Sequence, residues 1–203
     1  MSARAARTME YGRVAMRPLP LLATLVTSIL FSAPCLAEAR LGARAIAVGL
    51  RGTGQLGDYR LGGFGGQIRL RPMERVALDL FTDHYFGDER GGARHDHEIG
   101  ATIQYDVLRG DRWAIHPILG ACGLLAMAHA PQSDMTATDV RFGLRAGVGA
   151  ELLVTSRLSL QAQAQVVAYV GHDFAPYAWP GGTADELSVR AVGQFHAAAN
   201  VWF

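Results

Sequence analysis

Apolar and polar residues alternate with a period of two in four long segments of the chain. These segments cover residues 99–107, 140–152, 158–170 and 189–203. In the first of them, Gln104 stands between the apolar Ile103 and Tyr105. Because successive side chains of a β-strand point to opposite faces, this period predicts strands with one apolar and one polar face.

Four further segments alternate less regularly and bring the predicted number of strands to eight. They cover residues 43–51, 61–71, 75–83 and 113–125. A tilted strand needs about 9 to 11 residues to cross a bilayer. The predicted strands meet or approach that length, which is longer than the usual strand of a water-soluble protein.

Long polar connections alternate with short ones along this series of predicted strands. The long connections cover residues 52–58, 84–96, 128–139 and 171–186, and the short ones cover 72–74, 108–112 and 155–157. Outer-membrane barrels alternate in this way, with short periplasmic turns and longer extracellular loops. A sheet in hydrocarbon must also close on itself to pair every backbone group. The sequence therefore predicts an all-β fold, an eight-stranded antiparallel up-and-down transmembrane β-barrel.

The first 37 residues have the features of a signal peptide that is removed on export. A basic stretch that includes Arg13 and Arg17 precedes an apolar run at residues 21–31, and small residues then lead to Ala37. The alternative is an N-terminal membrane anchor, but the apolar run is shorter than the roughly 20 residues that a spanning helix needs. We expect a signal peptide at residues 1–37 and a barrel domain at residues 38–203.

The charge of the chain excludes one class of partner. The formal net charge is +1, with 19 basic and 18 acidic residues. Nucleic-acid-binding domains collect an excess of basic residues on one face. We therefore expect no nucleic-acid partner, and no cofactor motif is present in the sequence.

Two stretches of the chain resemble a known family. They are the glycine-rich residues 143–151 and the ending Asn200-Val201-Trp202-Phe203. Both look like the small outer-membrane β-barrel proteins of the OmpA/OmpX type. The resemblance implies a location in the bacterial outer membrane, among outer-membrane lipids and lipopolysaccharide. It also implies that Phe203, with Val201 on the same face, forms the signal that the barrel assembly machinery reads.

Polar residues on the inward faces of the predicted strands carry both signs of charge. An eight-stranded barrel has an interior just wide enough for side chains to fill. The candidate interior network comprises Arg69, Asp79, Glu98, Asp106, Arg141, Arg145, Glu151 and Arg190. Because an unpaired buried charge is costly, we expect these residues to pair and plug the barrel. The alternative is a narrow, porin-like pore for small solutes.

Residues 83–98 concentrate histidines and carboxylates in one predicted extracellular loop. Imidazole and carboxylate groups bind divalent metals, but the spacing lacks a second diagnostic ligand pair. We therefore expect a solvated loop and no metal site.

The sequence also lacks a hydrolase motif. Lipid A deacylases pair a His-x-Ser pattern with an asparagine, whereas His196 precedes Asn200 with no serine between them. We expect no catalytic residues and a structural or surface-interaction role, with long loops available to an extracellular partner. A solute channel is the first alternative, and a lipid-modifying enzyme is the second.

Overall fold

The computed structural model describes residues 45–57, 60–89, 92–129, 136–172 and 187–203. These residues all belong to one compact unit, Leu36–Phe203. The expected signal peptide at residues 1–37 lies outside the described residues. Among the described residues there is no helix long and apolar enough to cross a membrane.

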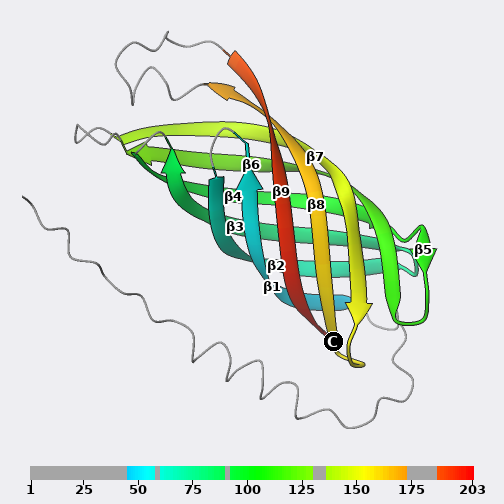
Figure 1. Cartoon of the computed structure of the whole chain (residues 1–203). Helices are drawn as coiled ribbons and strands as arrows, with labels where there is room; N and C mark the ends of the chain where they lie inside the picture. The colour runs from blue at the N-terminus through cyan, green and yellow to red at the C-terminus, as the bar shows by residue number, and fades with distance from the viewer. Residues whose placement is uncertain (1–44, 58–59, 90–91, 130–135, 173–186) are drawn as a thin grey trace, which may run out of the picture. The chain divides into compact units, whose positions relative to one another are not determined.

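The described residues form a single closed antiparallel sheet (Figure 1). Its eight long strands and one short strand are β1 (Ile46–Leu56), β2 (Arg60–Met73), β3 (Val76–Glu89), β4 (Gly92–Tyr105), β5 (Leu108–Arg109), β6 (Trp113–His129), β7 (Thr136–Leu153), β8 (Leu158–His172) and β9 (Leu187–Trp202). Each long strand pairs with the next, and β1 pairs with β9 to close the barrel. This confirms the predicted eight-stranded barrel.

The two ends of the barrel differ in their connections. At one end, here called the turn end, short connections join β2 to β3 and β7 to β8, and Phe203 lies beside β1 through a 2.9 Å hydrogen bond from its backbone nitrogen to the Ile46 carbonyl. At the other end, here called the loop end, lie the connections from β1 to β2, β3 to β4, β6 to β7 and β8 to β9. The short strand β5 pairs only with β6 and lies at the turn end.

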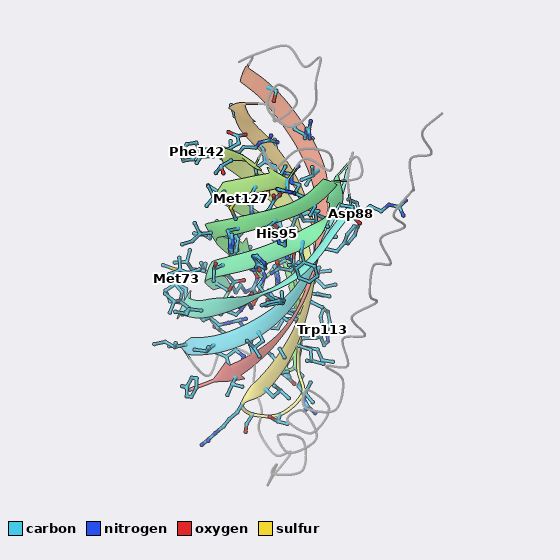
Figure 2. The ribbon with its side chains drawn as sticks, turned by 90° about the vertical axis from the view of Figure 1, so that its left-hand side faces the viewer. Met73, Asp88, His95, Trp113, Met127 and Phe142 are labelled. Atoms are coloured by element: carbon cyan, nitrogen blue, oxygen red, sulfur yellow. The ribbon has the colours of Figure 1, made fainter. Side chains whose placement is uncertain are left out.

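The outer wall of the barrel is apolar and the interior is polar. Outward-facing Leu144 and Phe142 are 72% and 73% exposed, whereas inward-facing Arg69 and Glu98 are 0% and 1% exposed. Figure 2 shows Met73 and Phe142 on the outside of the wall. A water-soluble protein places its apolar side chains inside. This reversed distribution matches a surface that faces lipid.

Aromatic side chains mark the turn end of the outer wall. Tyr105, Trp113 and Phe203 are all exposed there. Girdles of aromatic residues mark the boundary between hydrocarbon and head groups, where Tyr and Trp combine an apolar body with a polar group. The position of these three side chains is that of an aromatic girdle at this end of the barrel.

Glycines on the inner wall leave room for large polar side chains. A Cβ atom at Gly149 would lie 2.6 Å from Nε2 of His116 and 3.1 Å from Cδ1 of Ile118. Both His116 and Ile118 are buried in the barrel. The glycine-rich sequence of β7 therefore serves packing inside the barrel.

The strands are longer than the sequence pattern predicts at the loop end. Residues 84–96, expected as a loop, belong mostly to β3 and β4, which pair continuously from Val76↔Tyr105 to Glu89↔Gly92. Likewise β1 continues through Leu56, inside the expected loop 52–58. The prediction was wrong because strands that leave the bilayer carry polar residues on both faces, and the two-residue period is then lost.

Candidate functional site

The polar side chains inside the barrel form the candidate site, because they decide whether anything can pass through it. Buried arginines, carboxylates, histidines and amides come from all eight long strands. They form successive clusters from the turn end to the loop end.

Glu151 is the centre of the cluster at the turn end. Its Oε2 atom lies 3.2 Å from Nη2 of Arg69 and 2.7 Å from Nη2 of Arg71, both on β2. Its Oε1 atom accepts a 2.7 Å hydrogen bond from the hydroxyl of Ser159 on β8. One carboxylate of β7 thus joins β2 and β8 across the interior.

Each of the two arginines also holds a second carboxylate. Nη1 of Arg69 donates to both oxygens of Asp79, at 2.9 and 3.0 Å. Nη1 of Arg71 donates to Asp106 at 2.9 Å, and Nδ1 of His116 lies 3.4 Å from the other oxygen of Asp106. Removing charged groups from water costs free energy, and ion pairs that also form several hydrogen bonds can offset that cost.

Trp202 lies beside this cluster. Its indole Nε1 donates to the hydroxyl of Ser159 at 2.9 Å, and the guanidinium of Arg71 lies 5.5 Å from the centre of its ring. Trp202 is 4% exposed and faces inward, whereas its neighbours Val201 and Phe203 face outward. The C-terminal segment therefore contributes to both the interior and the lipid-facing wall.

Side-chain amides connect the turn-end cluster to the middle of the barrel. Nε2 of Gln67 donates to Gln161 at 3.0 Å and to Asn200 at 2.7 Å. Gln161 donates to Gln104 at 3.2 Å. From the other side, Nη1 of Arg51 donates to the Gln67 carbonyl at 3.3 Å. Amides suit this level because each carries both donors and an acceptor.

Two arginines in the middle of the barrel lie against the ring of Phe81. The guanidinium carbons of Arg51 and Arg145 are 4.6 and 4.3 Å from the ring centre. Nε of Arg51 lies 3.0 Å from Asp83, and Nη2 of Arg145 forms an ion pair with Glu98. Cation–π contact and an opposite charge together stabilise each buried guanidinium.

Neutral groups complete the middle cluster. The Tyr169 hydroxyl donates to Oε2 of Glu98 at 2.7 Å, and Nε2 of Gln194 donates to the same oxygen at 2.9 Å. Nδ1 of His196 lies 2.6 Å from Nη2 of Arg51. Because Arg51 can only donate, Nδ1 of His196 is the acceptor in this contact.

Ion pairs within single strands lie nearest the loop end. Nε and Nη2 of Arg94 donate to the two oxygens of Asp96, each at 2.8 Å. Nε of Arg141 lies 2.7 Å from Asp139. In both pairs the residues are two positions apart, so they share one face of the strand.

The structure buries seven of the eight residues of the candidate network and half-buries the eighth. The seven are Arg69, Asp79, Glu98, Asp106, Arg141, Arg145 and Glu151; the eighth is Arg190, on β9 opposite Tyr169. Arg69, Asp79 and Glu151 meet in one cluster, and Glu98 pairs with Arg145.

Sequence reasoning missed several central residues. Arg71 lies two positions after Arg69, and extending the same period by one step would have found it. Arg51 is preceded on its face by the small residues Ala47 and Gly49, which hide the alternation. Arg94 lies in residues 84–96, which the sequence pattern predicts to be a loop. For Arg51 and Arg94, the alternation of apolar and polar residues is too weak to predict that the side chain faces the interior.

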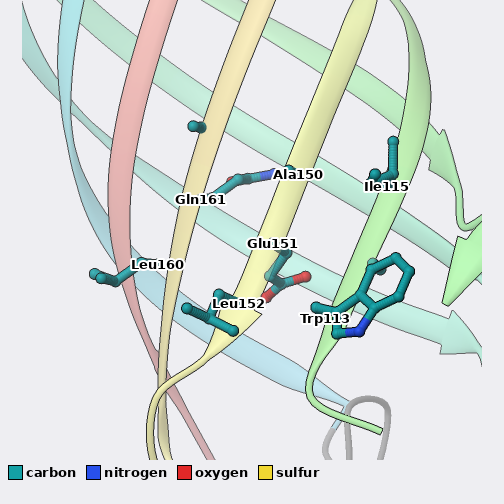
Figure 3. Close-up of a pocket in the computed structure, with 9 residues that line it drawn as sticks. Trp113, Ile115, Ala150, Glu151, Leu152, Leu160 and Gln161 are labelled. Carbon is teal, nitrogen blue, oxygen red and sulfur yellow. The ribbon is translucent and has the colours of Figure 1, made fainter. Parts of the chain in front are cut away.

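A shallow apolar hollow lies on the outer wall near the turn end, with a volume of about 360 Å³ (Figure 3). Its small residues, Ala150 and Ala162, are directly opposite each other on β7 and β8. Trp113, Leu152 and Leu160 line it as well. A hollow of this shape on an apolar wall can receive part of a lipid chain.

The described part of the chain contains no group of three or more histidine, cysteine or acidic side chains arranged to hold a metal ion. Cys122 is buried in the wall, and its sulfur lies 3.7 Å from the Gly143 carbonyl. Neither observation points to a catalytic centre.

Comparison with known proteins gives a match in structure and none in sequence. No protein-family model matches the chain, and no curated protein sequence matches it. A major outer membrane protein from Thermus thermophilus is similar in structure, with a TM-score of 0.52 and 17% identity over 79% of this chain and 100% of that one.

This chain has the fold of a small outer-membrane β-barrel. Two other solved barrels match with lower scores. Neisserial surface protein A has a TM-score of 0.47 and 18% identity, covering 78% of this chain and 96% of its own. The N-terminal barrel of Pseudomonas aeruginosa OprF has a TM-score of 0.49 and 15% identity, covering 77% and 97%. The exposed apolar side chains of this chain form the kind of outer wall that a barrel of this fold presents to lipid.

Proposed function

We propose that the protein is a non-catalytic outer-membrane barrel with a plugged interior. In this role it spans the membrane as a rigid wall and presents its loop end to partners outside the cell. The observation that carries the proposal is the series of clusters of ion pairs and hydrogen bonds at successive levels, from the one beside Trp202 at the turn end to the Arg94–Asp96 pair at the loop end.

The energetics of the interior favour a plug. Moving Arg69, Arg71 or Arg145 aside to open a path would separate each from a buried carboxylate. Breaking one buried pair costs about 3–5 kcal/mol. Several such pairs lie at different levels, so a solute would have to disrupt more than one of them.

Single-channel recording in planar bilayers tests the plug directly. We expect no discrete conductance steps from the purified barrel at concentrations at which a control porin inserts and conducts. Reproducible ion steps would overturn the plugged-barrel proposal in favour of a pore.

A narrow solute channel is the second candidate, and one observation favours it. Both amide atoms of Gln55, Nε2 of Gln163 and Oε1 of Gln165 are buried without a hydrogen-bond partner among the described residues. Polar atoms of this kind are suited to hydrogen-bonding a permeating solute. The channel then requires that the turn-end cluster around Glu151 can open.

The lipid environment supplies the remaining partners. We propose that the apolar wall contacts outer-membrane lipids and lipopolysaccharide, and that the loop end carries any contact with an extracellular partner. Protease digestion of intact cells should cut the chain only at the loop end. A separate incubation with lipopolysaccharide should leave its acyl chains unchanged by mass spectrometry, and altered chains would make the protein an enzyme.

A further inference from the structure

Three histidines gather on the outer face of β3 and β4, away from the polar interior. His84 on β3 is half-buried, and His95 and His97 on β4 are exposed. Figure 2 shows His95 on this side of the barrel, near Met127 of the neighbouring strand β6. None of the three takes part in the interior clusters.

Strand pairing places two of these histidines directly opposite each other. His84 and His97 are partners in the β3–β4 register. Directly opposed residues of an antiparallel pair have Cβ atoms only about 4.5–5.5 Å apart. Their ring centres are 4.2 Å apart, and their Nδ1 atoms are separated by 3.2 Å.

This separation of the two Nδ1 atoms is close to the distance between two ligand atoms of one tetrahedral metal ion. Zinc binds histidine nitrogen at about 2.0–2.1 Å in tetrahedral geometry, so two ligands of one ion lie roughly 3.3–3.4 Å apart. We propose that His84 and His97 bind one zinc-like divalent cation through their Nδ1 atoms. His97 is exposed, so water from the nearby outer boundary can fill the other coordination positions.

The surroundings hold the pair in place. The rings of Phe64 and Phe86 lie 6.0 and 6.1 Å from the His84 ring. The His95 ring is stacked at 6.0 Å and 22° from that of His84, so it lies alongside the pair. An apolar surround limits solvent access to a metal and orients its ligands.

The position along the strand places the pair at the edge of the lipid-facing band. His84 is eight residues from Val76, the first residue of β3 at the turn end. With the rise and tilt of a membrane strand, this is about 20 Å of height, so the pair lies about 5 Å inside the outer edge of an apolar band about 25 Å tall. A cation bound here would be accessible from the outer aqueous boundary.

Titration of the untagged, refolded protein with Zn²⁺ in detergent tests the site. We expect one ion per chain by calorimetry. His84→Gln and His97→Gln should each lower the affinity at least as much as the 10–100-fold typical of losing an outer hydrogen-bond partner. The control His129→Gln removes another outward histidine, on β6 and away from the pair, and should leave the affinity essentially unchanged.

Two results would overturn the proposal. One is that the wild-type protein does not bind Zn²⁺, and the other is that the His84 and His97 variants bind as tightly as the His129 control. Heat-modifiable migration in a detergent gel verifies that each variant is folded. A measurement on the wild type alone adds an independent test. The electron paramagnetic resonance spectrum of bound Cu²⁺ should show hyperfine coupling to two histidine nitrogens. Coupling to a single nitrogen would contradict binding by the pair.

Discussion

Glu151 forms ion pairs with two buried arginines of β2. It neutralises part of the charge of both Arg69 and Arg71 and accepts a hydrogen bond from Ser159. The Glu151 carboxylate stabilises the fold because the two arginines are already buried and need an opposite charge. Removing the carboxylate leaves both buried arginines without this partner.

We expect Glu151→Gln to lower the free energy of unfolding by about 3–5 kcal/mol, since Gln cannot neutralise the two arginines. Urea unfolding in lipid vesicles, followed by tryptophan fluorescence, measures this loss. Glu74→Gln is the matched control, because the Glu74 side chain is 81% exposed and lies 3.5 Å from Arg109. Equal stability of the Glu151 variant and the control would contradict the role assigned to the cluster.

Gly149 gives a second test at the level of single residues. Gly149→Val should destabilise the barrel by about 1–3 kcal/mol, the range for overpacking, because its Cβ would press on the buried His116 ring. Gly123→Ala is the control, since a Cβ there would meet nothing within 4 Å. The same unfolding assay compares the two, and an unaffected Gly149→Val variant would show that the inner wall is looser than described.

At the scale of strands, the alternation of side chains places apolar residues against lipid on one face and small or polar residues against the barrel interior on the other. On β7, Val148 faces outward and is 59% exposed, while its neighbours Gly147 and Gly149 face the interior. Val148 is five residues from the end of β7 at Leu153, which corresponds to about 13 Å of height. This places Val148 near the middle of the apolar band.

The depth of a residue should therefore decide how a charge is tolerated. Val148→Arg should cost about 2–4 kcal/mol in unfolding free energy, whereas Thr138→Arg on the same face should cost about 0–1 kcal/mol. Thr138 lies fifteen residues from Leu153 and so beyond the band. Unfolding in vesicles measures both losses of free energy. Similar losses at the two positions would mean that the apolar band does not lie at the height assigned to it.

Sequence pattern predicts these strands only where the two faces meet different surroundings. The alternation of residues 140–152 and 158–170 predicts the cores of β7 and β8 because lipid and interior select opposite residue types. Between Asp83 and Asp96 the pattern fails, since the loop end of β3 and β4 is polar on both faces. Partners such as Arg69 and Glu151 come from strands far apart in sequence, and alternation carries no information about register across the interior.

At the scale of the whole molecule, Phe203 lies at the seam where the barrel closes. It is 69% exposed on the outer wall, and its backbone nitrogen bonds to Ile46 of β1. Val201 lies on the same face two residues earlier. The expected role of this pair as an assembly signal remains a prediction.

Phe203→Asp should lower the amount of barrel in the outer membrane severalfold, because it removes the aromatic group and places a charge at the lipid boundary. Phe203→Tyr, which keeps the ring, should assemble normally. Surface labelling of intact cells measures the difference. Normal surface levels of the Asp variant, with proper heat-modifiable migration, would show that this residue is not part of the signal.

The β1–β9 seam also determines when the fold can be completed. Ala47 is paired with Trp202, and Leu50 with Ala199, across almost the whole length of the described chain. Until β9 has been synthesised, β1 keeps an unpaired edge that can join another chain. Contacts so distant in sequence form slowly. We therefore expect a newly made chain to remain open until β9 is in place, and to need protection from aggregation until the seam forms.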